Sequence, residues 1–211
     1  MSETVVMSLD QAPNNTGWAL GRPCDPRPLF GKFELPPWGS DEPKRAAKLY
    51  LWLTGMIDKH GVTHLFYEKD VPRAGMGKAI MSAPKRGKPR PIVVNTKDPA
   101  ITLNQNAVIA VVWLAAELNG IPVAPIDVNA MRSRFIGTSH ITGLQGEALT
   151  KELKQRAVKA CAMRGWLVED HNVAEALGHL DYALSVVDRR HAGKMDVLSA
   201  RTELSIWRGE R

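Results

Sequence analysis

Three acidic side chains lie where a buried carboxylate could do chemistry. Asp10 ends the apolar run of residues 4–9, Glu68 ends a second apolar run, residues 62–67, and Glu175 lies near the start of a helix-forming stretch. A buried charge is costly unless cations or a metal ion offset it. An aspartate after a strand is also a common turn cap. Taken alone, Asp10 therefore fits either a chemical role or a turn cap.

The elements that must position these acids follow from the hydrophobic periodicity. Apolar alternation predicts strands, and apolar residues at helical spacing predict long helices. The expected strands are residues 4–10, 16–20, 29–35, 62–68 and 121–126, and the expected helices are residues 41–59, 102–119, 147–164 and 170–187. This order predicts one α/β layer fold, a mixed five-stranded sheet flanked by helices. We expect one domain over residues 1–188 and a basic extension over residues 189–211.

Carboxylates at neighbouring strand ends favour a divalent metal site. Clustered carboxylates repel one another and need cations to stay ionised together. Oxygen ligands suit Mg²⁺ or Mn²⁺, and a pair of such ions can activate water and stabilise the leaving oxygen in phosphodiester cleavage. No Gly-rich phosphate loop of the Walker type is present, and no Ser/His/Asp order or reactive cysteine setting stands out. The residues therefore favour metal-dependent hydrolysis of a phosphodiester.

The segment from residue 71 to residue 97 is basic and contains no acidic residue. Several glycines and prolines interrupt it, so we expect a positively charged loop. Its basic residues are Arg73, Lys78, Lys85, Arg86, Lys88, Arg90 and Lys97. Such a cluster is typical of contacts with a phosphate backbone. The alternative is a solvated surface loop.

Composition sets broad limits on the partner and the compartment. The chain has 211 residues and a formal net charge of +6, which favours an anionic partner such as nucleic acid. Its two cysteines, Cys24 and Cys161, form neither a metal-ligand pattern nor a disulfide framework. The first residues show no signal peptide, and no apolar run reaches membrane-spanning length. We therefore expect a cytoplasmic protein with no membrane partner.

Three short motifs, in order, resemble those of a known family. They are Leu9-Asp10 followed by Thr16-Gly17-Trp18-Ala19, then Tyr67-Glu68, then Asp-His-Asn-Val-Ala-Glu-Ala-Leu over residues 170–177. The order of elements resembles the ribonuclease H fold. The motifs resemble RuvC-type Holliday junction resolvases, especially the divergent phage and prophage forms. Glu175 stands where the family usually has aspartate. The resemblance covers about residues 3–187.

The resemblance implies a homodimeric, Mg²⁺-dependent endonuclease that nicks two strands of a four-way DNA junction, in recombination or repair. It implies that Asp10, Glu68 and Glu175 are catalytic metal ligands, with Mn²⁺ able to replace Mg²⁺. The alternatives are a related nuclease that acts on flaps or other branched nucleic acid, and a branched-DNA-binding module without efficient catalysis. The glutamate at position 175 keeps the last alternative open.

A fourth site position is implied just before Glu175, where three residues compete. Asp170, His171 and Asn172 are the candidates, and Asp170 is also a plausible helix cap. Helical spacing places His171 on the face of Glu175, so we favour His171 as a ligand or general base and keep Asp170 as a possible metal ligand. His179, further along this helix, and Asp181 are interpreted as surface or packing residues.

The resemblance also implies which basic residues contact DNA. In the family, the segment after the second acid and lysines near the last motifs face DNA. The candidates are Arg73, Lys78, Lys85, Arg86, Lys88, Arg90, Lys151 and Lys154. Phosphate contacts of this kind supply affinity rather than sequence choice.

Overall fold

The computed structural model describes residues 3–12, 14–37, 39–69, 79–81, 91–93, 99–188 and 190–191, with backbone alone for residues 79–81, 91–93 and 99–104. One five-stranded sheet organises the chain. Its strands are β1 (Val6–Gln11), β2 (Asn15–Gly21), β3 (Leu29–Glu34), β4 (His64–Glu68) and β7 (Val123–Ile126). They lie in the order β3-β2-β1-β4-β7. The pairs β1–β2 and β2–β3 are antiparallel, whereas β1–β4 and β4–β7 are parallel.

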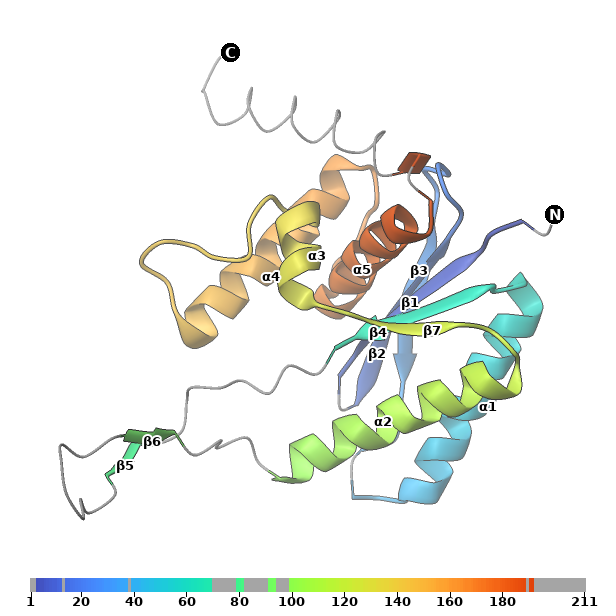
Figure 1. The fold of residues 1–211 in the computed structure, drawn as a ribbon, viewed down its shortest axis with the longest axis horizontal. Helices are drawn as coiled ribbons and strands as arrows, with labels where there is room; N and C mark the ends of the chain where they lie inside the picture. Colours follow the sequence, from blue (N-terminus) through green and yellow to red (C-terminus); the bar gives the residue numbers. More distant parts are fainter. Residues whose placement is uncertain are drawn as a thin grey trace.

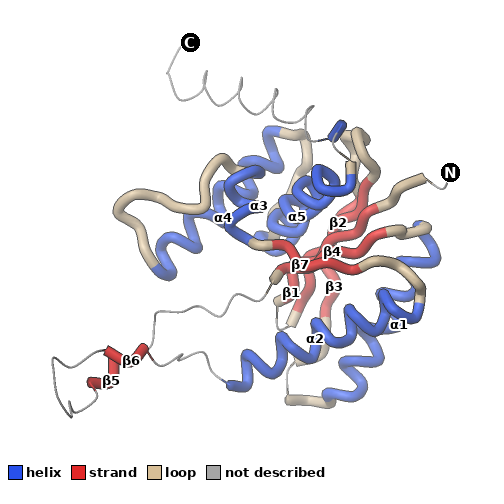
Figure 2. The backbone as a smooth tube through the Cα atoms, in the orientation of Figure 1, coloured by secondary structure: helices blue, strands red, loops and turns tan. Residues whose placement is uncertain are grey.

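Helices cover both faces of this sheet (Figures 1 and 2). They are α1 (Glu42–His60), α2 (Pro99–Leu118), α3 (Val128–Phe135), α4 (Gly146–Met163) and α5 (His171–Val187). Helices α1 and α2 lie on one face, and α3, α4 and α5 lie on the other. The mixed five-stranded sheet flanked by helices that the sequence predicts is therefore confirmed.

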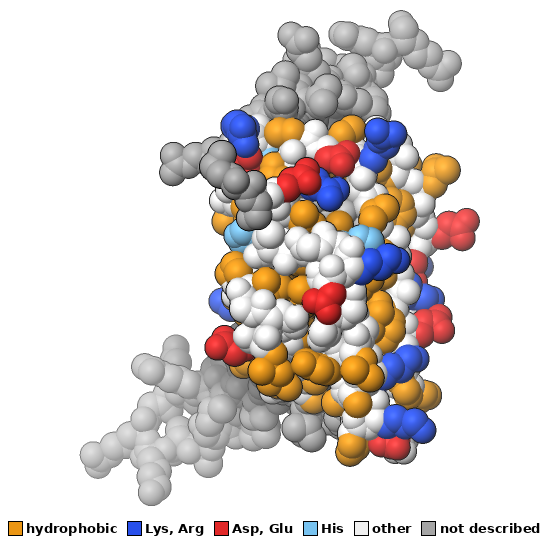
Figure 3. Space-filling view, turned by 90° about the vertical axis from the view of Figure 1, so that its right-hand side faces the viewer, with side chains coloured by type: hydrophobic (Ala, Val, Ile, Leu, Met, Phe, Trp, Pro, Cys, Tyr) orange, Lys and Arg blue, Asp and Glu red, His pale blue; other side chains and the backbone are white. Residues whose placement is uncertain are grey.

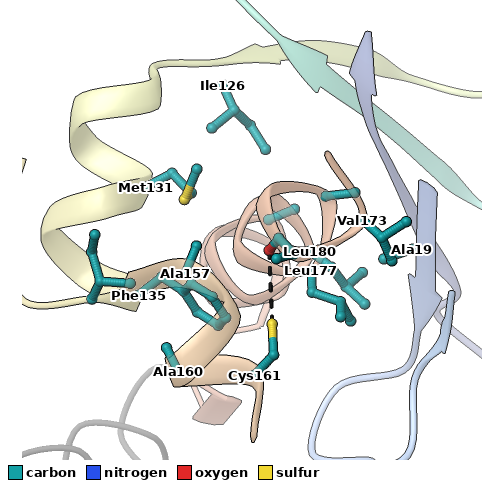
Figure 4. Close-up of a cluster of buried hydrophobic side chains, with 14 of the residues drawn as sticks. Ala19, Ile126, Met131, Phe135, Ala157, Ala160, Cys161, Val173, Leu177 and Leu180 are labelled. Carbon is teal, nitrogen blue, oxygen red and sulfur yellow. Dashed lines mark hydrogen bonds between the residues drawn. The ribbon is translucent and has the colours of Figure 1, made fainter. Parts of the chain in front are cut away.

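Strand alternation divides the interior into two cores. Met7 and Leu9 of β1 pack with α1 and α2, whereas Val6 of β1 packs with α3, α4 and α5. This division follows from the pleat, because successive side chains of a strand point to opposite faces of the sheet. Helix α5 is buried along most of its length, and Figure 4 shows Leu177 and Leu180 of this helix inside the second core. Helix α5 is therefore the helix that brings residues to the middle of the sheet.

Glycine lets α3 approach α5 closely. A Cβ at Gly178 would lie 2.7 Å from Sδ of Met131 and 3.0 Å from Cδ1 of Phe135. Both of these side chains come from α3 and line the core in Figure 4. Helix α3 is therefore held directly against the centre of α5.

Three elements were not predicted from the sequence. Helix α3 follows β7 within a stretch for which no helix was expected, and the short strands β5 (Ala79–Met81) and β6 (Pro91–Val93) pair as an antiparallel ribbon. The prediction of a loop throughout the basic segment is therefore wrong for these six residues. Helix α2 also begins three residues earlier than the expected start at residue 102.

A buried charge cluster ties residue 191 to the body of the domain. Asp181 accepts a hydrogen bond from Nε of Arg134 at 2.9 Å, and its other carboxylate oxygen lies 3.4 Å from Nε2 of His191. The Nδ1 atom of the same histidine accepts from the backbone N–H of Cys24 at 3.1 Å. Asp181 is thus a buried, paired residue, so of the two interpretations, surface or packing, the structure supports packing. The proposed boundary at residues 188 and 189 stays a prediction.

The surface at the end of the molecule near the chain's N-terminus carries both acidic and basic side chains. It forms the right-hand side of Figure 1 and faces the viewer in Figure 3, where acidic and basic side chains are interspersed. The carboxyl ends of β1, β4 and β7 point away from this face. Within the described ranges, no helix is both long and apolar enough to cross a membrane.

Candidate active site

The register of the parallel strands brings Asp10 and Glu68 together. Leu9 of β1 pairs with Tyr67 of β4, so the next residue of each strand, Asp10 and Glu68, continues the same register. Ser8 and Asp10 alternate with Leu9 and therefore face α5 rather than α1 and α2. Two carboxylates thus meet on the α5 side, at the carboxyl ends of neighbouring strands.

Two contacts fix α5 over this point. The hydroxyl of Ser8 donates to the carbonyl oxygen of Ala176 at 2.7 Å. Gly17, which pairs with Asp10 across β1 and β2, lies so close to α5 that a Cβ there would be 2.2 Å from the carbonyl oxygen of Asn172. Glu175 lies between these two α5 positions and is only 3% exposed. The first turns of α5 therefore place the carboxylate of Glu175 beside Asp10 and Glu68.

The charges of Glu68 and Glu175 both act on the carboxyl group of Asp10. Asp10 is 5% exposed. Burial raises the pKa of its carboxyl well above the usual range, and the charge of Glu68, a hydrogen bond with Glu68 and the charge of Glu175 raise it further. Lys154 acts weakly in the opposite direction. Without a cation, Asp10 therefore holds a proton more tightly than an ordinary carboxylate.

Glu175 is held ionised by two cationic side chains. Its Oε1 accepts from Nε of Arg132 at 3.0 Å and also from Nη2 of the same guanidinium, and its Oε2 lies 3.4 Å from Nζ of Lys154. Burial alone would raise the pKa of Glu175, but Arg132 and Lys154 outweigh it and lower the pKa. One carboxylate of the site is thus kept charged while its neighbour Asp10 resists ionisation.

The donor set fits a divalent metal ion. Oδ2 of Asp10 is buried and has no hydrogen-bond partner among the described residues. Such an acceptor, beside Glu68 and Glu175, has the chemistry that Mg²⁺ or Mn²⁺ requires. In the part of the chain that the structure describes, no three Asp, Glu, His or Cys side chains are arranged to hold a metal ion. Both carboxylate oxygens of Glu175 are engaged, one with Arg132 and the other with Lys154. Metal binding would therefore require Glu175 to exchange at least one of these partners.

The three candidates for the fourth position differ in their surroundings. Asp170 is the N-cap of α5, accepts from the N–H of Asn172 at 2.8 Å and lies 3.6 Å from Nζ of Lys32. Asn172 donates to Oδ1 of Asn15 and accepts from Lys154. His171 is exposed at the first turn. The structure gives no contact from Asp170 or His171 to Asp10, Glu68 or Glu175, so their metal and catalytic roles stay predictions.

His179 is the histidine that lies beside the carboxylates. It is fully buried, one turn after Glu175 on α5, so of the two interpretations, surface or packing, only packing within the fold remains. Burial lowers the pKa of its imidazole, and the charges of Glu68 and Glu175 oppose that shift. His179 follows Glu175 by four residues, just as His171 precedes it by four. This helical spacing supported the prediction for His171 and was not applied to His179.

Arg132 has no signal in the sequence that would have assigned it to the site. It lies 43 residues before Glu175, on a helix that was not predicted. Its position depends on the packing of Met131 and Phe135 against Gly178, which aims this face of α3 at α5. Only the three-dimensional arrangement could reveal this contact.

The predicted DNA contacts are only partly described. Lys154 lies at the site through Glu175 and Asn172, and Lys151, one turn earlier on α4, is exposed. The six residues of the basic segment, Arg73, Lys78, Lys85, Arg86, Lys88 and Arg90, lie outside the described residues. A pocket opens beside Glu68, and it is lined by Gln11, Glu68, Gln105 and Ile109. Glu68 is therefore accessible from outside the core.

Comparison with known proteins finds similarity in structure. No family model matches the chain, and no curated protein matches it in sequence. Among solved structures, RuvC of Thermus thermophilus in complex with a Holliday junction substrate aligns with 87% of this chain and 94% of its own, with a TM-score of 0.57 and 13% identity. A second structure of Thermus thermophilus RuvC covers 87% and 95%, with a TM-score of 0.56 and 14% identity.

The yeast mitochondrial Holliday junction resolvase Ydc2 aligns with 84% of this chain and 76% of its own, with a TM-score of 0.47 and 15% identity. The likeness to RuvC extends over most of both chains, so it includes the sheet and the helices on both of its faces. The chain thus has the fold seen in RuvC, the ribonuclease H-like fold that the order of its elements predicted.

Proposed function

We propose that this chain is a divalent-metal-dependent endonuclease that cuts four-way DNA junctions. The observation that carries the proposal is the convergence of Asp10, Glu68 and Glu175 at the carboxyl edge of the sheet. The fold adds support, since a solved structure with the same architecture is RuvC in complex with a Holliday junction substrate. Around Asp10 the negative charge of the carboxylates exceeds the positive charge of nearby side chains. A hydrolytic metal site needs such an excess of negative charge.

Each residue of the site has a distinct task in this proposal. Asp10 and Glu68 would hold Mg²⁺ through carboxylate oxygens, and Glu175 would complete the set once it no longer pairs with Arg132 or Lys154. The ion, when bound, activates water and stabilises the leaving oxygen. Lys154 is only partly buried, so its ammonium group is placed to bind a non-bridging oxygen of the substrate phosphate once it leaves Glu175. These exchanges would couple substrate binding to assembly of the site.

Paired cutting of a junction requires two copies of the site, so the proposal includes a homodimer. An exposed apolar surface on α1 and α2 supports it. Leu51 is 69% exposed, Leu114 is 51% exposed and Leu118 is 63% exposed. These side chains lie on the face opposite α5, so a partner there would leave Asp10 and Glu175 clear.

The decisive test is cleavage of a plasmid that extrudes a cruciform, with Mg²⁺. A linear product shows that both strands were cut within one binding event, whereas a nicked circle shows single cuts. We expect linear product, and we expect synthetic four-way junctions to be cut in preference to flaps. Preferential cutting of flaps would favour the related-nuclease alternative. Tight binding of junctions without any cutting would favour the binding module, in which Arg132 and Lys154 permanently neutralise Glu175.

Binding should depend on the basic segment through its phosphate contacts. Replacing Lys85, Arg86, Lys88 and Arg90 together by glutamine is expected to weaken junction binding and reduce its salt dependence, by up to about 0.9 slope units per lost contact on duplex DNA. The measurement is the dissociation constant for a labelled junction at several salt concentrations. Replacing Lys44, Lys48 and Lys59 of α1 by glutamine removes three positive charges from another part of the chain and serves as the control. A slope unchanged by the first set would return the segment to the solvated-loop interpretation.

A further inference from the structure

A buried imidazole without a hydrogen-bond partner lies beside the carboxylates. His179 is 0% exposed, and neither Nδ1 nor Nε2 has a hydrogen-bond partner among the described residues. Leaving a buried polar group unpaired destabilises the folded protein. Buried polar groups without partners are rare in folded proteins, so each one calls for a physical reason.

The position of His179 supplies that reason. It follows Glu175 by one helical turn, so the two side chains project from the same face of α5. Helix α5 packs against β1 and β4, the strands that carry Asp10 and Glu68. The imidazole lies near enough to Glu68, Glu175 and Arg132 for the charges of all three to act on it. His179 therefore occupies the inner side of the carboxylate site.

The residues just before Glu175 are less suited to complete the site. The Asp170 carboxylate caps α5 and pairs with Lys32, and the Asn172 amide bonds to Asn15 and Lys154. His171 is exposed at the helix start. Only His179 combines complete burial, unpaired nitrogen atoms and proximity to two of the acids among these candidates.

We propose that His179 supplies a nitrogen ligand to the cation held by Asp10, Glu68 and Glu175. This inference rests on the metal-dependent function proposed above. The neutral imidazole carries a lone pair on one ring nitrogen and is a common metal ligand. A nitrogen ligand adds no further negative charge to a site that already contains three carboxylates. The fourth ligand thus comes from one turn after the last acid, rather than from the residues before it.

The test uses Mn²⁺ as a paramagnetic probe in the full-length protein. Mn²⁺ binding is titrated by electron paramagnetic resonance, and electron spin echo modulation of the bound ion reports directly coordinated nitrogen. The variants are His179→Gln and, as a matched control, His171→Gln on the same helix. We expect wild type and His171→Gln to show nitrogen modulation and equal affinity. We expect His179→Gln to lose the modulation and to bind Mn²⁺ about tenfold or more weakly, as is typical when the support of a metal site is removed.

The outcomes separate this inference from the proposed function. If wild type binds Mn²⁺ without nitrogen modulation, or if the modulation persists in His179→Gln, the His179 inference is wrong while the metal site stands. If wild type binds no Mn²⁺, both the His179 inference and the proposed metal-dependent function are wrong. Loss of the modulation in His171→Gln would assign the ligand to the exposed histidine instead.

A second measurement covers the case in which His179→Gln does not fold. Five other histidines are present: His60, His64, His140, His171 and His191. Each is replaced singly by glutamine in protein labelled with ¹⁵N-histidine, and the echo modulation from ¹⁵N is recorded with Mn²⁺ bound. Modulation retained in all five variants leaves His179 as its source. Its loss in any one of them overturns the inference.

Discussion

Asp10→Asn is expected to abolish Mg²⁺-dependent cleavage of a four-way junction, by at least about 10³-fold, while junction binding stays within about twofold of wild type. The amide removes one carboxylate from the proposed metal site, and stabilisation by a metal ion is worth several kcal/mol in the transition state. Binding is spared because Asp10 is buried and acidic, so it makes no attractive contact with phosphate. Single-turnover cleavage and electrophoretic binding assays measure the two effects separately.

The same substitution should stabilise the metal-free protein at neutral pH. Burial and then the charge of Glu68 raise the pKa of Asp10 in the folded protein. The folded protein therefore binds a proton that the unfolded chain has released, and stability falls as pH rises from about 4 through the higher folded pKa. Asn at this position has no ionisable proton and can still donate to Glu68. We expect its melting temperature in chelator to exceed that of wild type by roughly 2–8 °C above the folded pKa, and the difference to shrink towards about pH 4.

Added Mg²⁺ should reverse this order. An ion that binds only the folded state stabilises it in proportion to the logarithm of its concentration over the dissociation constant. Wild type should gain stability and Asp10→Asn should gain little. Asp58→Asn, an exposed acid of α1, is the matched control and should behave as wild type in every assay. Cleavage that survives in Asp10→Asn, or equal stabilisation of both proteins by Mg²⁺, would remove Asp10 from the metal site.

Gly17→Ala is expected to lower both stability and activity by a large factor. The new Cβ would lie 2.2 Å from the carbonyl oxygen of Asn172, a backbone atom that cannot yield without moving α5. Overpacking of this kind costs about 2–4 kcal/mol, which corresponds to a fall in melting temperature of roughly 5–15 °C. Displacement of Glu175 by about 1 Å from Asp10 would slow cleavage about 100-fold. Thermal denaturation and cleavage well below the melting temperature measure the two losses.

Gly55→Ala is the control for this substitution. Gly55 lies inside α1, and a Cβ there would have no neighbour within 4 Å. Alanine is a better helix former than glycine, so we expect stability to rise by about 0.5–1 kcal/mol and cleavage to stay unchanged. A Gly17→Ala protein with the stability and rate of wild type would show that α5 does not contact β2 at this point.

Much of the fold could be predicted because its signals are local. The strands that carry Asp10 and Glu68 near their ends show apolar runs, and Gly61, Gly120 and Gly165 end helices with positive φ angles. Their order restricts the chain to a layered α/β fold. Helix α3 was missed because its eight residues carry only two buried side chains, Met131 and Phe135, which is too short a pattern for periodicity to reveal.

Only the site residues that lie near the end of a strand or the start of a helix could be predicted from the sequence. Asp10 and Glu68 follow from strand endings, and Glu175 from its place early in a helix. Arg132 and His179 depend on how α3 and α5 rotate about their own axes after packing, which the spacing of residues does not determine. Residues that reach the site only through the packing of helices are therefore the ones that the sequence could not predict.

The hydrogen bond from Ser8 to Ala176 joins residues 168 positions apart. It holds the first strand against the last long helix, so the site depends on a contact that closes nearly the whole chain. Such contacts form late, because a long loop must be closed before they can contribute to stability. A nascent chain carries Asp10 and Glu68 long before Glu175 has been synthesised. If the proposed function holds, the order of synthesis would keep the site incomplete on the ribosome until helix α5 has docked.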